Sequence, residues 1–203
     1  NFETDAIAQY CDIVPTLIAA AGGTPPGDLD GKSLLPLLKG QTKFHRDQAY
    51  FLYNNRVKED KPDTHFSIRA VTDGRYKFIW NLTPENLYSV NITTCDLTGE
   101  VRETDFGRIY PSMIDRMGTD NHAESMVNRL RSRPQHQLYD LKNDPYELNN
   151  LAETPEYSEK IKKFKADIEG WMKQQGDDGH LDPEGMRAIN VADYEFPYPP
   201  KGS

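Results

Sequence analysis

Histidine and serine side chains could supply a zinc site or a nucleophile, but none of them stands in a motif that builds one. The chain has five histidines: His45, His65, His122, His136 and His180. Their spacing matches neither HxH nor HExxH, the patterns typical of zinc sites. Ser33 and Ser67 lack the Gly-x-Ser-x-Gly context of a hydrolase nucleophile. The sequence therefore predicts neither a zinc site nor a histidine-dependent nucleophile.

The cysteines and the paired acidic residues also favour structural roles. Cys11 and Cys95 lie far apart in segments of unlike character, which indicates neither a disulfide framework nor a metal site. We expect Cys11 to be buried as a small apolar side chain. Asp177-Asp178 follows the last predicted helix in a glycine-rich loop, where a solvated role is favoured.

The charge of the chain excludes one large class of partner. The net charge is -8, which argues against nucleic-acid binding because that function needs a basic surface. Lys and Arg concentrate locally in residues 56–77 and 129–133. Recognition of an anionic ligand would therefore depend on a few local cations or backbone N–H groups.

Length and hydropathy describe a chain with a thin core. It has 203 residues, 36% of them apolar, and a mean hydropathy of -0.77. Clustered apolar segments in such a chain indicate a piece of a larger protein, in which some faces meet a partner. No run of 18 apolar residues occurs, so no membrane span is predicted.

The first 40 residues predict two apolar helices. The first spans residues 12–21, with Asp12 as its N-cap and Gly22 at its end. The second spans residues 34–39, with Ser33 as its cap. Both helices are apolar on several sides, so we expect them to need a partner and to permit self-association if none is present.

From about Gln48 the apolar period changes to two, which predicts strands. The expected strands are residues 48–53, 67–72, 75–80 and 138–141. Asp73-Gly74 predicts a hairpin turn between the second and third strands. Two short helices are also expected. The first spans residues 111–117. The second spans residues 121–132, with Asn121 and Glu124 forming a capping box at its start.

The last predicted helix completes an α+β fold. Its apolar stripe consists of Tyr157, Ile161, Phe164, Ile168 and Trp171. These side chains lie on one face and would cover one side of the small antiparallel four-stranded sheet. The predicted organisation is a helical arm (1–40), a subdomain (41–176) with an insertion at 81–136, and an extended tail (177–203).

Residues 137–152, QLYDLKNDPYELNNLA, carry the most specific motif. This run resembles the C-terminal LYDL-x-x-DP-x-E-x-x-NLA signature of the sulfatase family. Three earlier segments are similar to family motifs in the same order: residues 12–17, 30–40 and 68–79. Arg133-Pro134 and the run from Trp171 to Asp177 resemble the branch that contains heparan N-sulfatases.

The resemblance implies a parent enzyme that hydrolyses sulfate esters or sulfamates of sulfated sugars. Such an enzyme uses Ca²⁺ and a formylglycine made in a C/S-x-P-x-R motif, which neither Cys11 nor Cys95 matches. We therefore expect no catalytic residue and no metal ligand in this chain. Both cofactors are expected in a missing N-terminal α/β domain of the same polypeptide, to which the arm would belong. The resemblance also implies a periplasmic, secreted or lysosomal location.

In that family the C-terminal subdomain forms one wall of the substrate pocket, which here corresponds to the loop 53–65. Its candidate substrate-binding residues are Asn54, Asn55, Arg56, Lys58, Glu59 and His65. Arg and Lys can pair with sulfate or carboxylate, and Asn or Glu can bind sugar hydroxyls. Arg69 alternates with apolar residues and is expected to form a buried structural ion pair. Tyr139 and Trp171 are expected in a core or an interface.

Two other functions stay open at this point. The chain could be a stand-alone, non-catalytic module that binds a glycan or a protein. It could also be a fragment of a related phosphonate or phosphodiester hydrolase. A C/S-x-P-x-R motif upstream of Asn1 would favour the sulfatase.

Overall fold

The computed structural model describes residues 3–54, 66–86, 88 and 109–179. The chain divides into two compact units. The first consists of Asn1–Leu52, Ile68–Asn81 and Pro134–Gly176, and the second of Tyr53–Ser67, Leu82–Arg133 and Asp177–Ser203. Among the described helices, none is long and apolar enough to cross a membrane.

A four-stranded sheet in the order β1-β2-β3-β4 forms the centre of the first unit. Its strands are β1 (Ala49–Asn54), β2 (Ser67–Thr72), β3 (Tyr76–Asn81) and β4 (His136–Asp140). The β2–β3 and β3–β4 pairs are antiparallel, with Val71 opposite Phe78 and Phe78 opposite Leu138. The predicted α+β fold is confirmed, and each strand lies within two residues of its expected position.

The hairpin turn between β2 and β3 is stabilised by one carboxylate. Asp73 Oδ1 accepts the N–H groups of Arg75 (3.0 Å) and Tyr76 (2.7 Å). Gly74 has a φ of +88°, a region that favours glycine. Arg75, expected in the strand, therefore belongs to the turn, and β3 begins at Tyr76.

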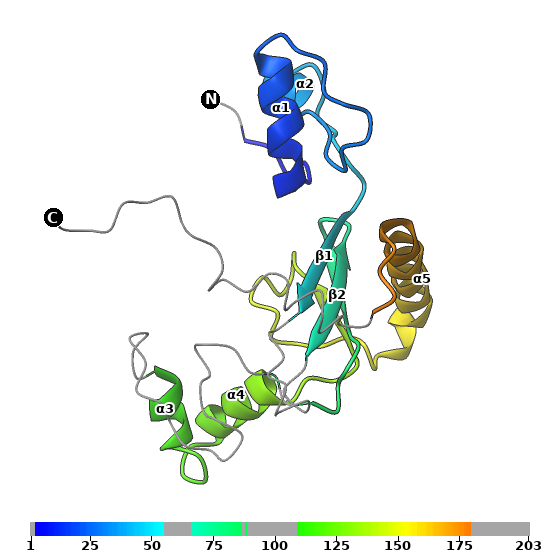
Figure 1. The fold of residues 1–203 in the computed structure, drawn as a ribbon. Helices are drawn as coiled ribbons and strands as arrows, with labels where there is room; N and C mark the ends of the chain where they lie inside the picture. The colour runs from blue at the N-terminus through cyan, green and yellow to red at the C-terminus, as the bar shows by residue number, and fades with distance from the viewer. Residues whose placement is uncertain (1–2, 55–65, 87, 89–108, 180–203) are drawn as a thin grey trace, which may run out of the picture. The chain divides into compact units, whose positions relative to one another are not determined.

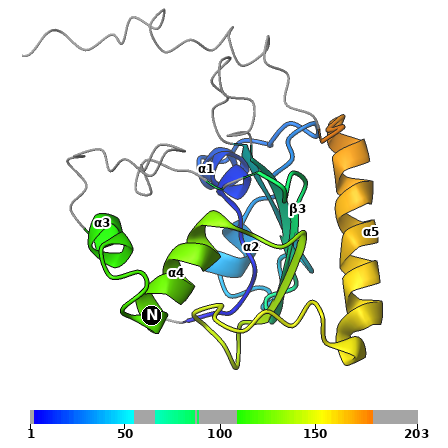
Figure 2. The same cartoon turned by 90° about the horizontal axis from the view of Figure 1, so that it is seen from below.

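One face of the sheet is covered by α5 (Ser158–Gln175), which follows the short 3₁₀ helix η4 (Pro155–Tyr157). Both views show α5 running along this face (Figures 1 and 2). The ring of Phe164 stacks on Phe78 at 6.4 Å between centroids, and Ile168 is fully buried. The predicted packing of this helix is confirmed.

The apolar stripe differs in one detail from the sequence prediction. Tyr157, Ile161 and Trp171 are only half-buried, whereas Met172 is buried and was not expected. Trp171 stacks on Tyr50 of β1, with ring centroids 5.3 Å apart. The contact face of α5 therefore shifts toward Met172 at the C-terminal end, and Gly176 closes the helix with a φ of 67°.

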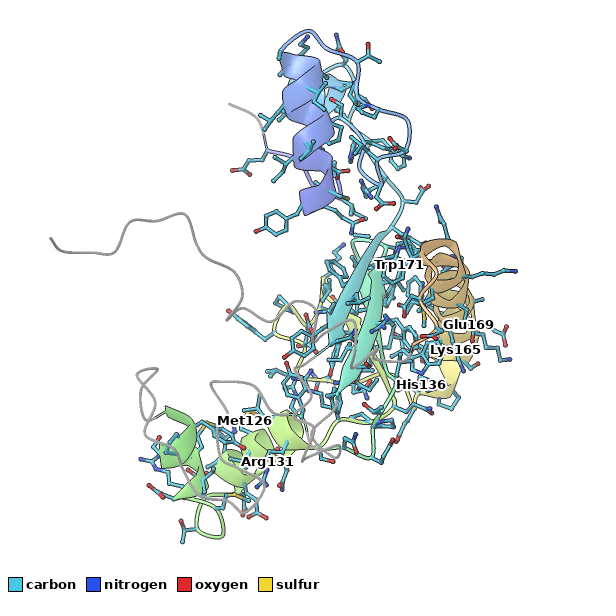
Figure 3. The ribbon with its side chains drawn as sticks, viewed as in Figure 1. Met126, Arg131, His136, Lys165, Glu169 and Trp171 are labelled. Atoms are coloured by element: carbon cyan, nitrogen blue, oxygen red, sulfur yellow. The ribbon has the colours of Figure 1, made fainter. Side chains whose placement is uncertain are left out.

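His136 on β4 lies near Lys165 of this helix (Figure 3). Burial lowers the pKa of His136, and the positive charge of Lys165 lowers it further. Its Nε2 is buried without a hydrogen-bond partner among the described residues. Protonation in the folded state is therefore unfavourable.

We expect the free energy of unfolding to fall as the pH drops below about 6.5, the ordinary histidine pKa, because the unfolded chain then takes up the proton more readily. His136→Phe should weaken this acid dependence between pH 7 and 5. The exposed His122→Gln variant is the control. Urea titrations at several pH values measure the effect, and identical pH dependence in both variants would contradict it.

In the LYDL motif of residues 137–152, Asp140 and Asn150 accept hydrogen bonds from backbone N–H groups, and Asp140 also accepts them from side chains. Asp140 accepts hydrogen bonds from Arg75 Nη2 (3.0 Å), Asn143 Nδ2 (2.9 Å) and the Lys142 N–H (3.2 Å). Asn150 Oδ1 accepts the N–H groups of Leu138 (2.9 Å) and Ala152 (3.0 Å). These bonds satisfy backbone groups where the chain leaves β4, so the motif has a structural role here. Tyr139, expected in a core, is buried.

The N-terminal arm contains the 3₁₀ helix η1 (Tyr10–Asp12), α1 (Ile13–Ala20) and α2 (Leu35–Leu38). It carries apolar surface without a cover among the described residues: Val14 is 55% and Leu17 64% exposed. Cys11 is exposed as well, so the expectation that it is buried is wrong. It lies in η1, just before the apolar face of α1 begins.

Asp12 does not cap α1 with its side chain, contrary to the sequence prediction. Its carboxylate is fully buried and bonds Arg46 Nη2 through Oδ1. The N–H groups of Lys32 (2.9 Å) and Gln9 (2.8 Å) donate to it, and His45 Nε2 lies 3.2 Å away. Burial alone would raise the pKa of Asp12, but these N–H groups and the Arg46 charge lower it below its ordinary value.

In the second unit, α3 (Ile109–Ile114) packs on α4 (Asn121–Arg131). Tyr110 and Val127 form the buried centre of this pair. The N-cap of α4 is Asp120, whose Oδ1 accepts the N–H groups of His122 (2.9 Å) and Ala123 (3.1 Å). The capping box predicted at Asn121 is therefore wrong, because the preceding carboxylate satisfies the first turn.

Candidate functional site

The structure places only one of the six predicted substrate-binding residues. Asn54 is the last residue of β1 and is half-buried. Its Oδ1 accepts a hydrogen bond from the hydroxyl of Ser67 at 2.8 Å. The remaining five lie outside the described residues: Asn55, Arg56, Lys58, Glu59 and His65. What the structure defines is therefore the base of the loop 53–65, where the chain leaves β1 and enters β2.

Three aromatic side chains, Tyr53, Phe66 and Tyr88, form this base. Phe66 is fully buried and meets the ring of Tyr88 edge to face, with centroids 5.2 Å apart. The ring centroids of Tyr53 and Tyr88 are 5.9 Å apart. Burial raises the pKa of the Tyr53 hydroxyl, and Tyr88 adds to this effect while Arg133 opposes it. We call these three residues the aromatic base.

Arg133 lies over the Tyr88 ring of the aromatic base. Its guanidinium carbon is 3.8 Å from the centroid of the Tyr88 ring, within the range of a cation–π contact. Tyr88 is held in place because its N–H donates to the carbonyl of Arg131 at 2.8 Å. Arg131 ends α4, and Figure 3 labels it there. A cation is therefore fixed at the base of the predicted substrate loop.

Sequence reasoning did not select Tyr88 or Arg133 as site residues. Tyr88 stands in a polar insertion without periodicity, and Arg133 contributed only to the family resemblance. The local concentration of Arg in residues 129–133 was the one signal that pointed to this place. The stack itself depends on chain segments that no local pattern connects.

Arg69 is buried, as expected, and the ion pair expected for it stays a prediction. It is 1% exposed in β2, and its Nη1 donates to the carbonyl of Ile68 at 2.9 Å. Its register partner on β3 is Trp80. Burial within the sheet supports a structural role for this arginine.

The described residues offer no ligand set for Ca²⁺. No three His, Cys, Asp or Glu side chains gather closely enough in that part of the chain to hold a metal ion. Its carboxylates, Asp12 and Asp140 among them, bind arginines and backbone N–H groups instead.

Comparison with known proteins identifies the family. The family model "N-sulphoglucosamine sulphohydrolase, C-terminal" matches residues 1–122. The chain therefore belongs to this family, and the predicted membership in the sulfatases is confirmed. An ulvan-active sulfatase of Formosa agariphila is 33% identical over 175 residues, which cover 86% of this chain and 30% of the relative. A second ulvan-active sulfatase of that organism is 29% identical over 182 residues, 86% of this chain and 27% of the relative.

Solved structures show the same fold. A putative sulfatase from Bacteroides thetaiotaomicron superimposes with a TM-score of 0.52 at 21% identity, over 85% of this chain and 27% of that one. A 2-O GAG sulfatase gives the same TM-score, identity and coverage. The chain thus spans about three tenths of the length of the relatives that it matches.

Proposed function

We propose that this chain is the C-terminal part of a sulfatase that hydrolyses sulfate esters or sulfamates of a sulfated polysaccharide. The family match carries this proposal. The identity of 33% to an ulvan-active sulfatase supports a polysaccharide as the substrate class. A part of the polypeptide outside these 203 residues would supply Ca²⁺ and the formylglycine that acts as the catalytic nucleophile.

The arm's exposed apolar face supports a partner domain in the same polypeptide. Val14, Leu17 and Leu38 are each more than half exposed, as is Leu52 in β1. Apolar surface of this extent usually marks an interface. The relatives are about three times longer than the match, so the rest of such a polypeptide is the occupant we propose. Self-association through the same face stays a prediction for the chain on its own.

The loop 53–65 supplies the proposed wall of the substrate pocket. Asn54 lies at its start, with its side chain bonded to Ser67. Asn55, Arg56, Lys58, Glu59 and His65 follow as candidates to bind sulfate, carboxylate or hydroxyl groups. The aromatic base lies at both ends of this loop, because Tyr53 is its first residue and Phe66 directly follows it.

We expect residues 1–203 alone to release no sulfate from a sulfated polysaccharide or an aryl sulfate, with Ca²⁺ present. The physical reason is the lack of a nucleophile motif in the sequence and of a metal cluster among the described residues. The whole polypeptide should release sulfate from the polysaccharide under the same conditions. Ion chromatography of free sulfate measures both, and boiled protein is the blank.

The outcomes separate the proposed function from its alternatives. Sulfate release by residues 1–203 well above the blank would refute the proposal that the catalytic groups lie outside these residues. Failure of the whole polypeptide on every sulfated substrate, with hydrolysis of a phosphonate or phosphodiester instead, would replace the sulfatase by a related hydrolase.

A further inference from the structure

Arg133 has an unusual electrostatic setting for a chain of net charge -8. Several other arginines of the described structure form ion pairs with carboxylates, such as Arg46 with Asp12 and Arg75 with Asp140. Arg133 has no ion pair and no hydrogen bond from its guanidinium to any described residue, and its Nε is buried without an acceptor. Its charge is thus uncompensated at a fixed position.

The contact with Tyr88 holds this guanidinium in one orientation, which favours binding of an oxyanion. The guanidinium carbon lies over the Tyr88 ring, 3.8 Å from its centroid. The N–H donors of a guanidinium form a rigid planar fork. Arg133 is half-buried, so solvent and ligands still reach it. A cation held in one orientation loses less freedom when it binds a sulfate or carboxylate through two parallel hydrogen bonds.

The surroundings place this cation where a substrate is expected. Tyr53 begins the loop 53–65 and Phe66 directly follows it, and both contact Tyr88, whose ring lies under Arg133. The position of the stack is further fixed by the bond between the Tyr88 N–H and the Arg131 carbonyl. Arg133 and the two residues at which the loop 53–65 begins and ends therefore share one contact, the ring of Tyr88.

We propose that Arg133 binds an oxyanion of the polysaccharide, either sulfate or uronate carboxylate, and that Tyr88 is the positioning residue that holds its guanidinium. This inference rests on the proposed function for its ligand class. The proposal adds Arg133, near the end of the insertion 81–136, to the candidate binding residues of the loop 53–65.

Kinetics of the whole polypeptide test the role in substrate binding. We expect Arg133→Ala to raise KM for the sulfated polysaccharide about tenfold, the effect of one lost charged contact, with kcat changed less than about twofold. Arg133→Lys should recover only part of the loss, because lysine lacks the planar fork. Tyr88→Leu should raise KM with Arg133 still present.

Arg116→Ala is the matched control, because it removes the same charge from an exposed position in the same unit. Its KM should stay at the parent value. Equal KM values for Arg133→Ala, Arg116→Ala and the parent would overturn the proposal.

Chemical protection gives a readout that does not depend on turnover. Phenylglyoxal modification of Arg133, measured by mass spectrometry on the whole polypeptide, is compared with sulfated, desulfated uronate-bearing and neutral oligosaccharides of equal length. Protection by the sulfated sugar alone assigns a sulfate, and protection by both anionic sugars assigns a carboxylate. Protection by neither, or equally by the neutral sugar, overturns the proposal.

The two hypotheses fail in different ways. If the whole polypeptide releases no sulfate but anionic sugars still protect Arg133, the binding residue stands and the proposed reaction falls. If sulfate is released while Arg133 stays unprotected, the reaction stands and this inference falls.

Discussion

Phe164→Ala should lower the free energy of unfolding by about 3–5 kcal/mol, as for other truncations of core aromatics. Phe164 is 2% exposed on α5 and stacks on Phe78, beside the fully buried Ile168. The substitution removes an aromatic ring from the layer between helix and sheet and leaves a cavity that neighbouring side chains fill only in part. Urea titration followed by circular dichroism measures the change.

Lys162→Ala on the same helix is the control. Its side chain is 72% exposed and bonds Glu159, which is 83% exposed, so this surface pair contributes little. We expect a change within about 0.5 kcal/mol. Equal midpoints for the two variants would mean that α5 does not stabilise the sheet through Phe164.

Asp12→Ala should lower the free energy of unfolding by a similar amount, about 3–5 kcal/mol, because it leaves a buried charge without its partner. The side chain of Arg46 is only 13% exposed and loses the carboxylate that it binds. The N–H groups of Lys32 and Gln9 lose their acceptor as well. Urea titration, with hydrogen exchange of residues 9–46, locates the loss in the arm.

A double variant distinguishes this ionic cluster from simple loss of packing. In Asp12→Ala/Arg46→Met the uncompensated charge is absent, so we expect a smaller destabilisation than in Asp12→Ala. Asp28→Ala, which removes an exposed carboxylate, should be nearly neutral. A double variant at least as unstable as the sum of its singles would refute the charge-based explanation.

Local patterns predicted the sheet and its covering helix. Alternation in residues 67–80, the Asp73-Gly74 turn and the stripe around Phe164 depend on neighbours within a few residues. In the LYDL motif, Asp140 bonds the nearby N–H of Lys142, whereas Asn150 bonds the N–H of Leu138 twelve residues away. Family membership followed from these motifs because their order is written in the sequence itself.

The partners of the polar side chains were decided by tertiary structure alone. Asp12 has the residue type and position of a helix cap, yet it binds Arg46 because the tertiary fold brings that cation, 34 residues away in sequence, to it. Cys11 is exposed although it lies in η1 directly before the fully buried Asp12. Arg133 meets Tyr88 across the insertion, where no period connects the two. A side chain's type limits the partners that it can bind, but long-range contacts choose among them, so the sequence determined the fold class and family, and the folded chain determined the site.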